Sequence, residues 1–334
     1  MRVLAASPTE IAWHSGLPVF ACKEFLQATG DEFGWIGGVD DSRKLRCILP
    51  YTVIRRLGFR VIRFRTDTIP LSEIAAEEER CFLNNVVEHF RQSQADMIIP
   101  ATNNALFRAY PDGAFAAPYG TFVNDLSKSE DELWGEMHEV CRRNIRKAMK
   151  GGVQIKSGKE YLDAAYKLIA DTLDRSGVNF RNYDEFRKMV LSLGDNVRIF
   201  IAEFQGAVQA CVVAPFSMHS GYYWYGGTLA ERAKGAMHLL MWQAMLELRA
   251  LGVKLFNFTG VRIDPEKGSK QEGILTFKMR FGGTLVQGYM WKYSFRPVKF
   301  AAYSLAVRLL RGGDIVDLER HKLGSAVAPG SPPC

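Results

Sequence analysis

The segment from Val197 to Gly283 constrains the fold most, because strands and helices alternate in it in one definite order. Three apolar, β-branched runs come first, at residues 197–204, 207–216 and 221–228, and short turns separate them, as in an antiparallel meander. Apolar residues with a helical period follow over residues 233–251, and a short buried strand follows at 254–258. This order predicts an α/β fold with mixed sheets.

A polar loop with three glycines runs from Gly260 to Gly273, before a short amphipathic stretch and a closing strand at 284–293. The complete order is three antiparallel strands, a helix, a parallel strand, a helix and a last strand. This order resembles the general N-acyltransferase (GNAT) fold, in which two strands diverge and open a cleft for the acyl donor. The resemblance therefore implies a donor cleft in the second half of the chain.

The loop and the stretch after it read FTGVRIDPEKGSKQEGILTFKMRFGG, which resembles the signature of the Fem family. The residues that carry this resemblance are Asp264, Pro265, Gly268, Gly273, Phe277, Lys278, Phe281 and Gly282. A second segment, CRRNIRKAMKGGVQI, resembles the helix that opens the second acyltransferase module of that family. Fem proteins are aminoacyltransferases that build peptidoglycan side-chain bridges from aminoacyl-tRNA.

The resemblance implies a tandem of two GNAT-like modules, of which the first is degenerate, and 334 residues are enough for two domains. We expect the first module, on the acceptor side, at residues 1–144, completed by a basic C-terminal helix at 296–323. The second module, on the acyl-donor side, is expected at 145–295. The tail at 324–334 is rich in Ala, Gly, Pro and Ser and is expected to be disordered.

One helix is expected from about Glu130 to Lys150, with Ser129 and Glu132 as a capping box. The net charge of the chain is +7, and no acidic residue lies between positions 142 and 159. Such a basic block suits the phosphates of tRNA, of a nucleotide-linked substrate or of an anionic membrane surface, and a solvated helix face is the alternative. The members predicted to bind substrate are Arg142, Arg143, Arg146 and Lys147.

The resemblance implies that Lys278, preceded by Phe277, is catalytic at the acyl-donor end. Aminolysis of an ester develops negative charge on the carbonyl oxygen, and a partly desolvated lysine can stabilise that charge. Without the resemblance, an exposed helix lysine is the simpler interpretation.

Four further residues are predicted to bind substrate. Arg262 and Lys270 belong to the glycine-containing loop, whose backbone amides could approach a phosphate or the tRNA acceptor end; a mobile surface loop is the alternative. The resemblance places Arg181 on the diphosphate of a nucleotide-linked precursor and Tyr225 along the transfer cleft. A structural role stays open for both, since Tyr225 belongs to an aromatic run.

The donor is predicted from the turn before the long helix. In GNAT enzymes that use acyl-CoA, a glycine-rich turn there holds the pyrophosphate on backbone amides. Here the turn reads ERAKGA at 231–236 and has no glycine pair, which favours aminoacyl-tRNA over acyl-CoA, although Arg232 and Lys234 could hold phosphate. The six histidines lack metal-ligand spacing, and no GxSxG or Walker motif occurs, so neither a metal nor another cofactor is expected.

The sequence therefore predicts a transferase that moves an aminoacyl group from aminoacyl-tRNA to an amine of a nucleotide-linked or lipid-linked peptidoglycan precursor. The alternative is an acyl-CoA-dependent N-acyltransferase that acts on an amino sugar in polysaccharide or lipid decoration. A third interpretation is a catalytically silent module that binds tRNA or a nucleotide sugar. The chain has no bilayer-spanning apolar run and no signal pattern, so we expect a cytoplasmic monomer with peripheral membrane contact at most.

Overall fold

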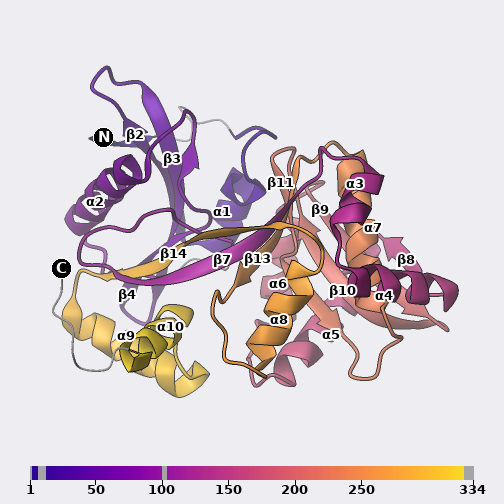
Figure 1. The fold of residues 1–334 in the computed structure, drawn as a ribbon. Coiled ribbons are helices and arrows are strands. Elements are labelled where there is room, and N and C mark those ends of the chain that lie inside the picture. The colour runs from indigo at the N-terminus through magenta and orange to yellow at the C-terminus, as the bar shows by residue number, and fades with distance from the viewer. Residues whose placement is uncertain (1, 7–12, 100–103, 327–334) are drawn as a thin grey trace. The chain divides into compact units, whose positions relative to one another are not determined.

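The computed structural model describes residues 2–6, 13–99 and 104–326 (Figure 1). The described residues form two compact units. The first unit consists of residues 2–6, 30–99, 104–120 and 287–326, and the second consists of residues 13–29 and 121–286. The chain passes from one unit to the other within strands β7 (Phe115–Asp125) and β14 (Thr284–Ser294).

The first unit is built on a sheet whose strands follow the order β1-β2-β3-β4-β6-β14. Strands β1 to β4 pair antiparallel, whereas β6 runs parallel to β4 and antiparallel to β14. Helix α2 packs a row of buried apolar side chains, from Phe82 to Phe90, into the core of this unit. The strands and the helix are β1 (Arg2–Ala6), β2 (Glu32–Val39), β3 (Leu45–Arg56), β4 (Phe59–Phe64), β5 (Ile69–Pro70), α2 (Ala76–Gln92) and β6 (Met97–Ile99).

Two C-terminal helices, α9 (Pro297–Arg311) and α10 (Ile315–Ala326), complete the first unit. The ammonium group of Lys292 on β14 is buried, and it pairs with Asp314 at 2.7 Å and with Asp317 at 2.6 Å. Helix α10 continues to residue 326, so it includes the first three residues of the expected disordered tail. Residues 327–334 lie outside the described part of the chain.

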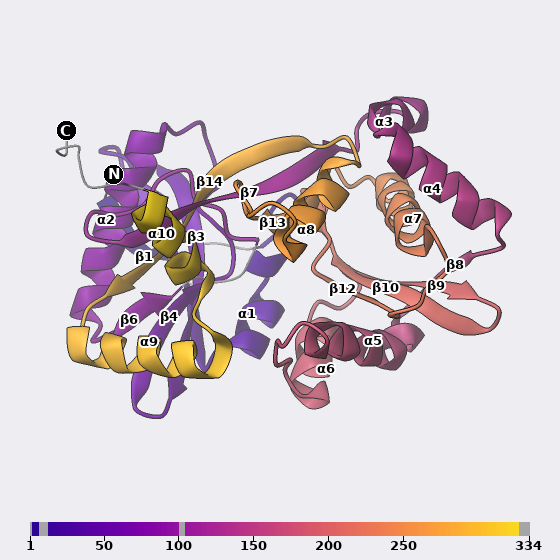
Figure 2. The ribbon, with the colours of Figure 1, turned by 60° about the horizontal axis from the view of Figure 1, so that its bottom comes forward.

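The second unit contains the antiparallel sheet β12-β10-β9-β8 and the parallel pair β11 and β13. Successive residues of β9 and β10 point to opposite faces, so Phe200 and Val212 pack under α4 and α7, while Ile199 and Val213 pack under α5 and α6 (Figure 2). The elements are α1 (Lys23–Thr29), α3 (Glu130–Glu136), α4 (Glu139–Lys150), β8 (Gln154–Ser157), α5 (Leu162–Asp174), α6 (Tyr183–Leu191), β9 (Val197–Phe204), β10 (Ala207–Pro215), β11 (Ser220–Tyr222), β12 (Tyr225–Thr228), α7 (Ala236–Ala250), β13 (Leu255–Val261) and α8 (Lys270–Met279).

The expected single helix from Glu130 to Lys150 is wrong, because the chain forms two helices there, α3 and α4. The capping box at Ser129 and Glu132 begins α3 as predicted. The backbone of Met137 is extended, and Nδ1 of His138 accepts a hydrogen bond from the Val140 N–H at 3.1 Å. A second N-cap inside the periodic apolar pattern therefore divides the helix.

The expected single strand at 221–228 also divides into two, β11 and β12, and the break changes the pairing partner. Tyr222 lies opposite Asn257 of β13, whereas Tyr225 lies opposite Val213 of β10. In between, the Tyr223 N–H still donates to the carbonyl of Asn257, at 2.9 Å, and the N–H of the next residue already donates to the carbonyl of Val213. The strands therefore diverge at this point, in the manner of the GNAT fold. The α/β class with mixed sheets is confirmed.

Among the helices of the described residues, none combines the length and the apolar character that crossing a bilayer requires.

Candidate functional site

A cavity of about 790 Å³ lies in the second unit, between β12, the start of α7 and helix α8. Its wall combines apolar side chains with several cations and backbone groups, as small-molecule sites usually do. The lining includes Asn144, Ser176, Tyr223, Gly226, Thr228, Arg232, Lys234, Gly235, His238, Lys270, Gly273, Ile274, Phe277 and Lys278. Three residues predicted from the sequence, Phe277, Lys278 and Lys270, are therefore brought together in one cavity.

Lys278 is buried in the wall of this cavity, with only 6% of its surface exposed. Its Nζ donates to the carbonyl oxygen of Gly260 at 3.0 Å and to that of Thr259 at 3.2 Å. The ammonium group also lies 5.7 Å from the ring centre of Tyr223, so two carbonyl dipoles and an aromatic face surround it. Burial lowers the pKa of Lys278 from 10.5 to about 7. Lys278 is thus not an exposed helix lysine.

Helix α8 positions Lys278 through its N-terminal cap. The hydroxyl of Ser269 accepts from the Glu272 N–H at 3.2 Å, and the Glu272 carboxylate accepts from the Gly268 N–H at 2.6 Å. Residues two turns apart on a helix share one face, so Lys270 and Lys278 line the same cavity about 12 Å apart along the axis. Nζ of Lys270 donates to the hydroxyl of Ser176.

Thr259 turns its carbonyl toward Lys278 by an unusual backbone conformation. Its φ is +56°, which is rare for a β-branched residue and costs about 1–3 kcal/mol. The conformation is held by Thr259 Oγ1, which donates to the Tyr223 carbonyl at 3.0 Å, and by Asn257 Oδ1, which accepts from the Thr259 N–H at 2.7 Å. The sequence gives no signal for this strained residue, because threonine seldom adopts a positive φ.

The start of α7 forms the opposite part of the cavity wall. Gly235 is the N-cap residue and has a φ of +84°, and a Cβ there would lie 2.1 Å from the Asn144 carbonyl oxygen. The Ala236 N–H donates to the Ala233 carbonyl at 3.1 Å, but no side chain caps this helix, so its other first-turn N–H groups can face an anion, with Arg232 and Lys234 also on the cavity wall. Gly235 thus permits the close approach of α7 to α4, although the glycine pair of acyl-CoA enzymes is missing.

His238, in the first turn of α7, also lines the cavity, and sequence analysis did not single it out. Burial, together with the nearby charges of Arg280 and Arg232, lowers the pKa of His238 to about 4. Its ring lies 5.2 Å from that of Phe277 and 6.0 Å from that of Phe281. The imidazole is therefore neutral at physiological pH and adds polarity to the wall without adding charge.

Three other predicted residues do not line this cavity. Tyr225 packs against Phe180 and Phe186, with ring centres 5.5 and 5.8 Å apart, on the α5 and α6 side of the sheet. Arg181 lies next to this aromatic group, and its carbonyl accepts from the hydroxyl of Tyr166. Arg262 is half-buried in the loop after β13. Their binding roles stay predictions.

The predicted basic block lies on α4, whose residue Asn144 reaches the cavity. Arg142 donates to the Gly135 carbonyl at 3.2 Å, and the guanidinium of Arg146 lies 5.3 Å from the ring centre of Trp134. Arg143 and Lys147 are exposed and make no ion pair or side-chain hydrogen bond with the described residues. These two cations are therefore available to an external phosphate. Nowhere in the described ranges do three His, Cys, Asp or Glu side chains gather as metal ligands.

Comparison with known proteins identifies similar sequences and folds. Residues 113–209 match the model of the FemAB family. The fold is similar to the crystal structure of FemX, with a TM-score of 0.66 and 14% identity over 90% of this chain and 99% of that chain. It is also similar to the C-terminal domain (DUF2156) of a putative lysylphosphatidylglycerol synthetase from Agrobacterium fabrum, with a TM-score of 0.52 and 12% identity over 85% and 91%. No curated protein matches the sequence.

The family match supports an acyltransferase, and the α/β fold is the one expected from the order of elements. The resemblance to the Fem family seen in the sequence is confirmed by this family match, which covers residues 113–209, and the fold is similar to that of FemX.

Proposed function

We propose that this protein transfers an aminoacyl group from aminoacyl-tRNA to an amine of a nucleotide-linked or lipid-linked peptidoglycan precursor. The observation that carries the proposal is the buried Lys278, held by two carbonyls in the wall of a 790 Å³ cavity. The FemAB match and the FemX-like fold support it. Charged tRNA occurs in the cytoplasm, so the proposal places the reaction there, with the protein acting as a monomer.

In this reaction the neutral acceptor amine attacks the ester carbonyl carbon. A C–N bond forms, the carbonyl oxygen becomes an oxyanion, and the C–O bond to the tRNA ribose then breaks. The amine loses one proton and the departing ribose hydroxyl gains one. An ammonium group has three N–H donors, and Lys278 uses two of them on Thr259 and Gly260. The third N–H is left to stabilise the oxyanion.

The low pKa of Lys278 suits the proton transfer as well. A group with a pKa of about 7 exists in both protonation states near neutral pH. Protonated Lys278 can give its proton to the departing ribose oxygen and can regain one from the attacking amine. The same residue therefore combines charge stabilisation with proton transfer, and Phe277 beside it shields the site from water.

The second candidate is an acyl-CoA-dependent N-acyltransferase that acts on an amino sugar. The uncapped start of α7, together with Arg232 and Lys234 on the cavity wall, favours it, because such a helix end binds a pyrophosphate. Charged tRNA is favoured by the exposed Arg143 and Lys147 of α4 and by the missing glycine pair. The charged tRNA would need the cations of α4, whereas acyl-CoA would not.

A donor test separates the two candidates. Purified protein is mixed with a pool of charged tRNAs, with the same pool uncharged, or with a panel of acyl-CoAs, and thermal stability and donor hydrolysis are measured. We expect hydrolysis of charged tRNA, which Lys278→Met abolishes and Lys267→Met, at an exposed loop lysine, leaves unchanged. Hydrolysis of acyl-CoA alone would replace the first candidate by the second.

A further inference from the structure

Helix α9 presents an apolar face to solvent. The side chains of Val298, Leu305 and Leu309 are 85%, 58% and 77% exposed, and a spacing of seven and then four residues places them on one side of the helix. The exposed Ala301 and Ala302 lie between them on the same side. Surface helices normally turn such an apolar face toward the core, whereas α9 turns it toward solvent.

The opposite side of α9 is already packed within the first unit. The ring of Phe300 stacks on that of Phe115 with centres 5.4 Å apart, and Tyr303 meets Phe59 edge to face at 6.1 Å. Lys299 donates to the Asp96 carboxylate at 2.9 Å. These contacts hold the helix in place. The exposure of its apolar outer face is therefore not the result of loose packing.

The hairpin between β3 and β4 extends this face. Its tip residue Leu57 is 89% exposed, and the carbonyl of the next residue, Gly58, accepts from Nζ of Lys299 on α9 at 2.8 Å. Leu57 follows Arg55 and Arg56 in the sequence. This hydrogen bond therefore connects the hairpin tip, with the apolar side chain of Leu57 and the two arginines before it, to the start of α9.

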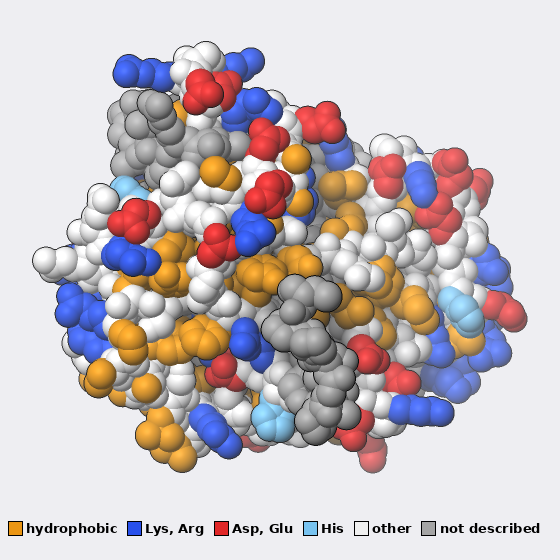
Figure 3. Space-filling model, turned by 60° about the vertical axis from the view of Figure 1, so that its left-hand side comes forward, with side chains coloured by type: hydrophobic (Ala, Val, Ile, Leu, Met, Phe, Trp, Pro, Cys, Tyr) orange, Lys and Arg blue, Asp and Glu red, His pale blue; other side chains and the backbone are white. Residues whose placement is uncertain are grey.

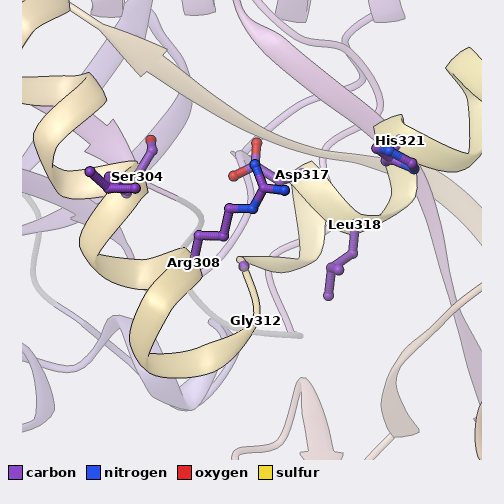
Figure 4. Close-up of a pocket in the computed structure, with 8 residues that line it drawn as sticks. Ser304, Arg308, Gly312, Asp317, Leu318 and His321 are labelled. Carbon is purple, nitrogen blue, oxygen red and sulfur yellow. The ribbon is translucent and has the colours of Figure 1, made fainter.

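Cations border the apolar face at both ends of the helix. A hollow of about 570 Å³ at the start of α9 is lined by Arg55, Arg56, Arg60, Arg296 and Lys299. Glu32 pairs with Arg55 and Arg60, and the buried Asp96 pairs with Arg296 and Lys299, so Arg56 is the member of this set that has no ion pair with the described residues. At the other end, a hollow of about 540 Å³ lies between α9 and α10 and is lined by Arg308 and by Asp317, whose carboxylate pairs with Lys292 (Figure 4). Helix α9 itself contains no acidic residue.

Figure 3 shows hydrophobic side chains beside Lys and Arg in the lower left part of one face of the molecule. Apolar side chains that are ringed by cations complement a surface with anionic groups above hydrocarbon. A membrane leaflet with anionic headgroups offers both in that order. Free phosphate offers no apolar layer, and a second copy of this chain, with its net charge of +7, is a poor source of the anionic groups.

We propose that the outer face of α9 and the Leu57 hairpin tip dock on an anionic phospholipid bilayer. Val298, Leu305, Leu309 and Leu57 enter the acyl-chain boundary, and Arg56 and Arg308 bind the lipid phosphates. This docking does not depend on which acyl donor or acceptor the second unit uses.

The test is co-sedimentation of the full-length protein with large vesicles of phosphatidylcholine that contain about one third phosphatidylglycerol. We expect binding to these vesicles and none to phosphatidylcholine alone. Binding falls as NaCl rises from about 0.05 to 0.5 M, because salt screens the cations. Leu305→Glu/Leu309→Glu lowers the partition coefficient by about tenfold or more. Arg56→Glu/Arg308→Glu lowers it too and flattens the salt dependence.

The control is Val178→Glu/Leu251→Glu, which charges two residues of the second unit that are 50% and 41% exposed. This variant should bind vesicles as the wild type does, and thermal melting confirms that every variant is folded. Failure of the wild type to bind anionic vesicles at low salt overturns the proposal, and so does undiminished binding of Leu305→Glu/Leu309→Glu. If the wild type had a doubled mass in solution and did not bind vesicles, and Leu305→Glu/Leu309→Glu abolished that doubled mass, the face would be assigned to a second copy of the chain instead.

Discussion

The buried surroundings of Lys278 determine its chemistry more than the fact that it is a lysine. Methionine has a similar length, so Lys278→Met keeps the packing and removes the charge. We expect this variant to lose at least about 100-fold in kcat/KM for transfer, since it removes the donor to the oxyanion. Transfer assays under single-turnover conditions measure the loss. Lys267→Met is the matched control, and turnover within about threefold of the wild type for Lys278→Met would remove the catalytic assignment.

The same residue makes stability depend on pH. The pKa of Lys278 is about 7 in the folded protein and near its usual 10.5 in the unfolded chain, so between these values the unfolded chain binds more protons. The free energy of unfolding must therefore rise from about pH 7 toward pH 10.5 through this group. Urea titrations of wild type and Lys278→Met at pH 7 and 9.5 should show this rise as a difference in slope between the two proteins, because the buried cysteines, whose pKa values burial raises, lower the stability of both equally toward pH 9.5. An equal slope in both proteins would contradict the buried state of Lys278.

Single site residues could be predicted from the sequence where they belonged to a recognisable motif. Lys278 and Phe277 belong to the Fem-like sequence motif. The burial of Lys278, however, depends on where the carbonyls of Thr259 and Gly260 point. That direction follows from a positive φ at Thr259, which no local pattern encodes. His238 was equally hidden, because a lone histidine in an apolar helix has no signature.

Among the elements, β12 depends on a close approach that only glycine allows. A Cβ at Gly227 would lie 2.6 Å from the backbone of Leu168 on α5. We expect Gly227→Ala to lower the free energy of unfolding by about 1–3 kcal/mol, because helix and strand must separate. Equilibrium unfolding in urea measures it. Gly135→Ala, where nothing lies within 4 Å, is the control and should be neutral or slightly stabilising.

Helix α4 allows a test of the proposed donor. Arg143→Glu/Lys147→Glu should weaken binding of charged tRNA about tenfold at low salt and reduce its salt dependence, because two phosphate contacts are lost. Filter binding over a range of NaCl concentrations measures both quantities. Arg187→Glu/Lys188→Glu changes two exposed cations of α6 and should have little effect. Equal losses in both variants would indicate non-specific attraction by net charge.

Most strands and helices were predictable from apolar periodicity, and the errors share one cause. The break between α3 and α4 and the break between β11 and β12 both interrupt a continuous apolar pattern. Periodicity reports which face is buried, but not which strand a residue pairs with or whether a side chain such as His138 caps a new helix. The cavity borders the second of these breaks, at Tyr223, so the least predictable element lies beside the candidate site.

Over the whole molecule, buried charge links helix α10 to strand β14 of the same unit. Asp314→Asn/Asp317→Asn leaves Lys292, which is 2% exposed, without a counter-charge. We expect a loss of about 3 kcal/mol in the free energy of unfolding, measured in urea. Adding Lys292→Met should recover most of it, since the unpaired charge is then gone. No recovery in the triple variant would mean that the aspartates stabilise α10 by another route.

The expected boundaries at residues 144/145 and 295/296 stay a prediction for the functional modules. The compact units are divided differently, because the chain passes between them within β7 and β14, and residues 13–29 belong to the second unit. Phe20, for example, packs on Tyr222 with ring centres 4.8 Å apart.

The path of the chain has a consequence for protein synthesis. All residues of the second unit have been synthesised once position 286 is added, whereas the first unit, begun earlier, still lacks residues 287–326. Until β14 is made, β6 has a free edge on its far side, at Met97 and Ile98, and α9 cannot yet cover Phe59. The unit whose sequence starts first is therefore the last to be completed, and a nascent chain stalled before residue 287 would be a substrate for chaperones.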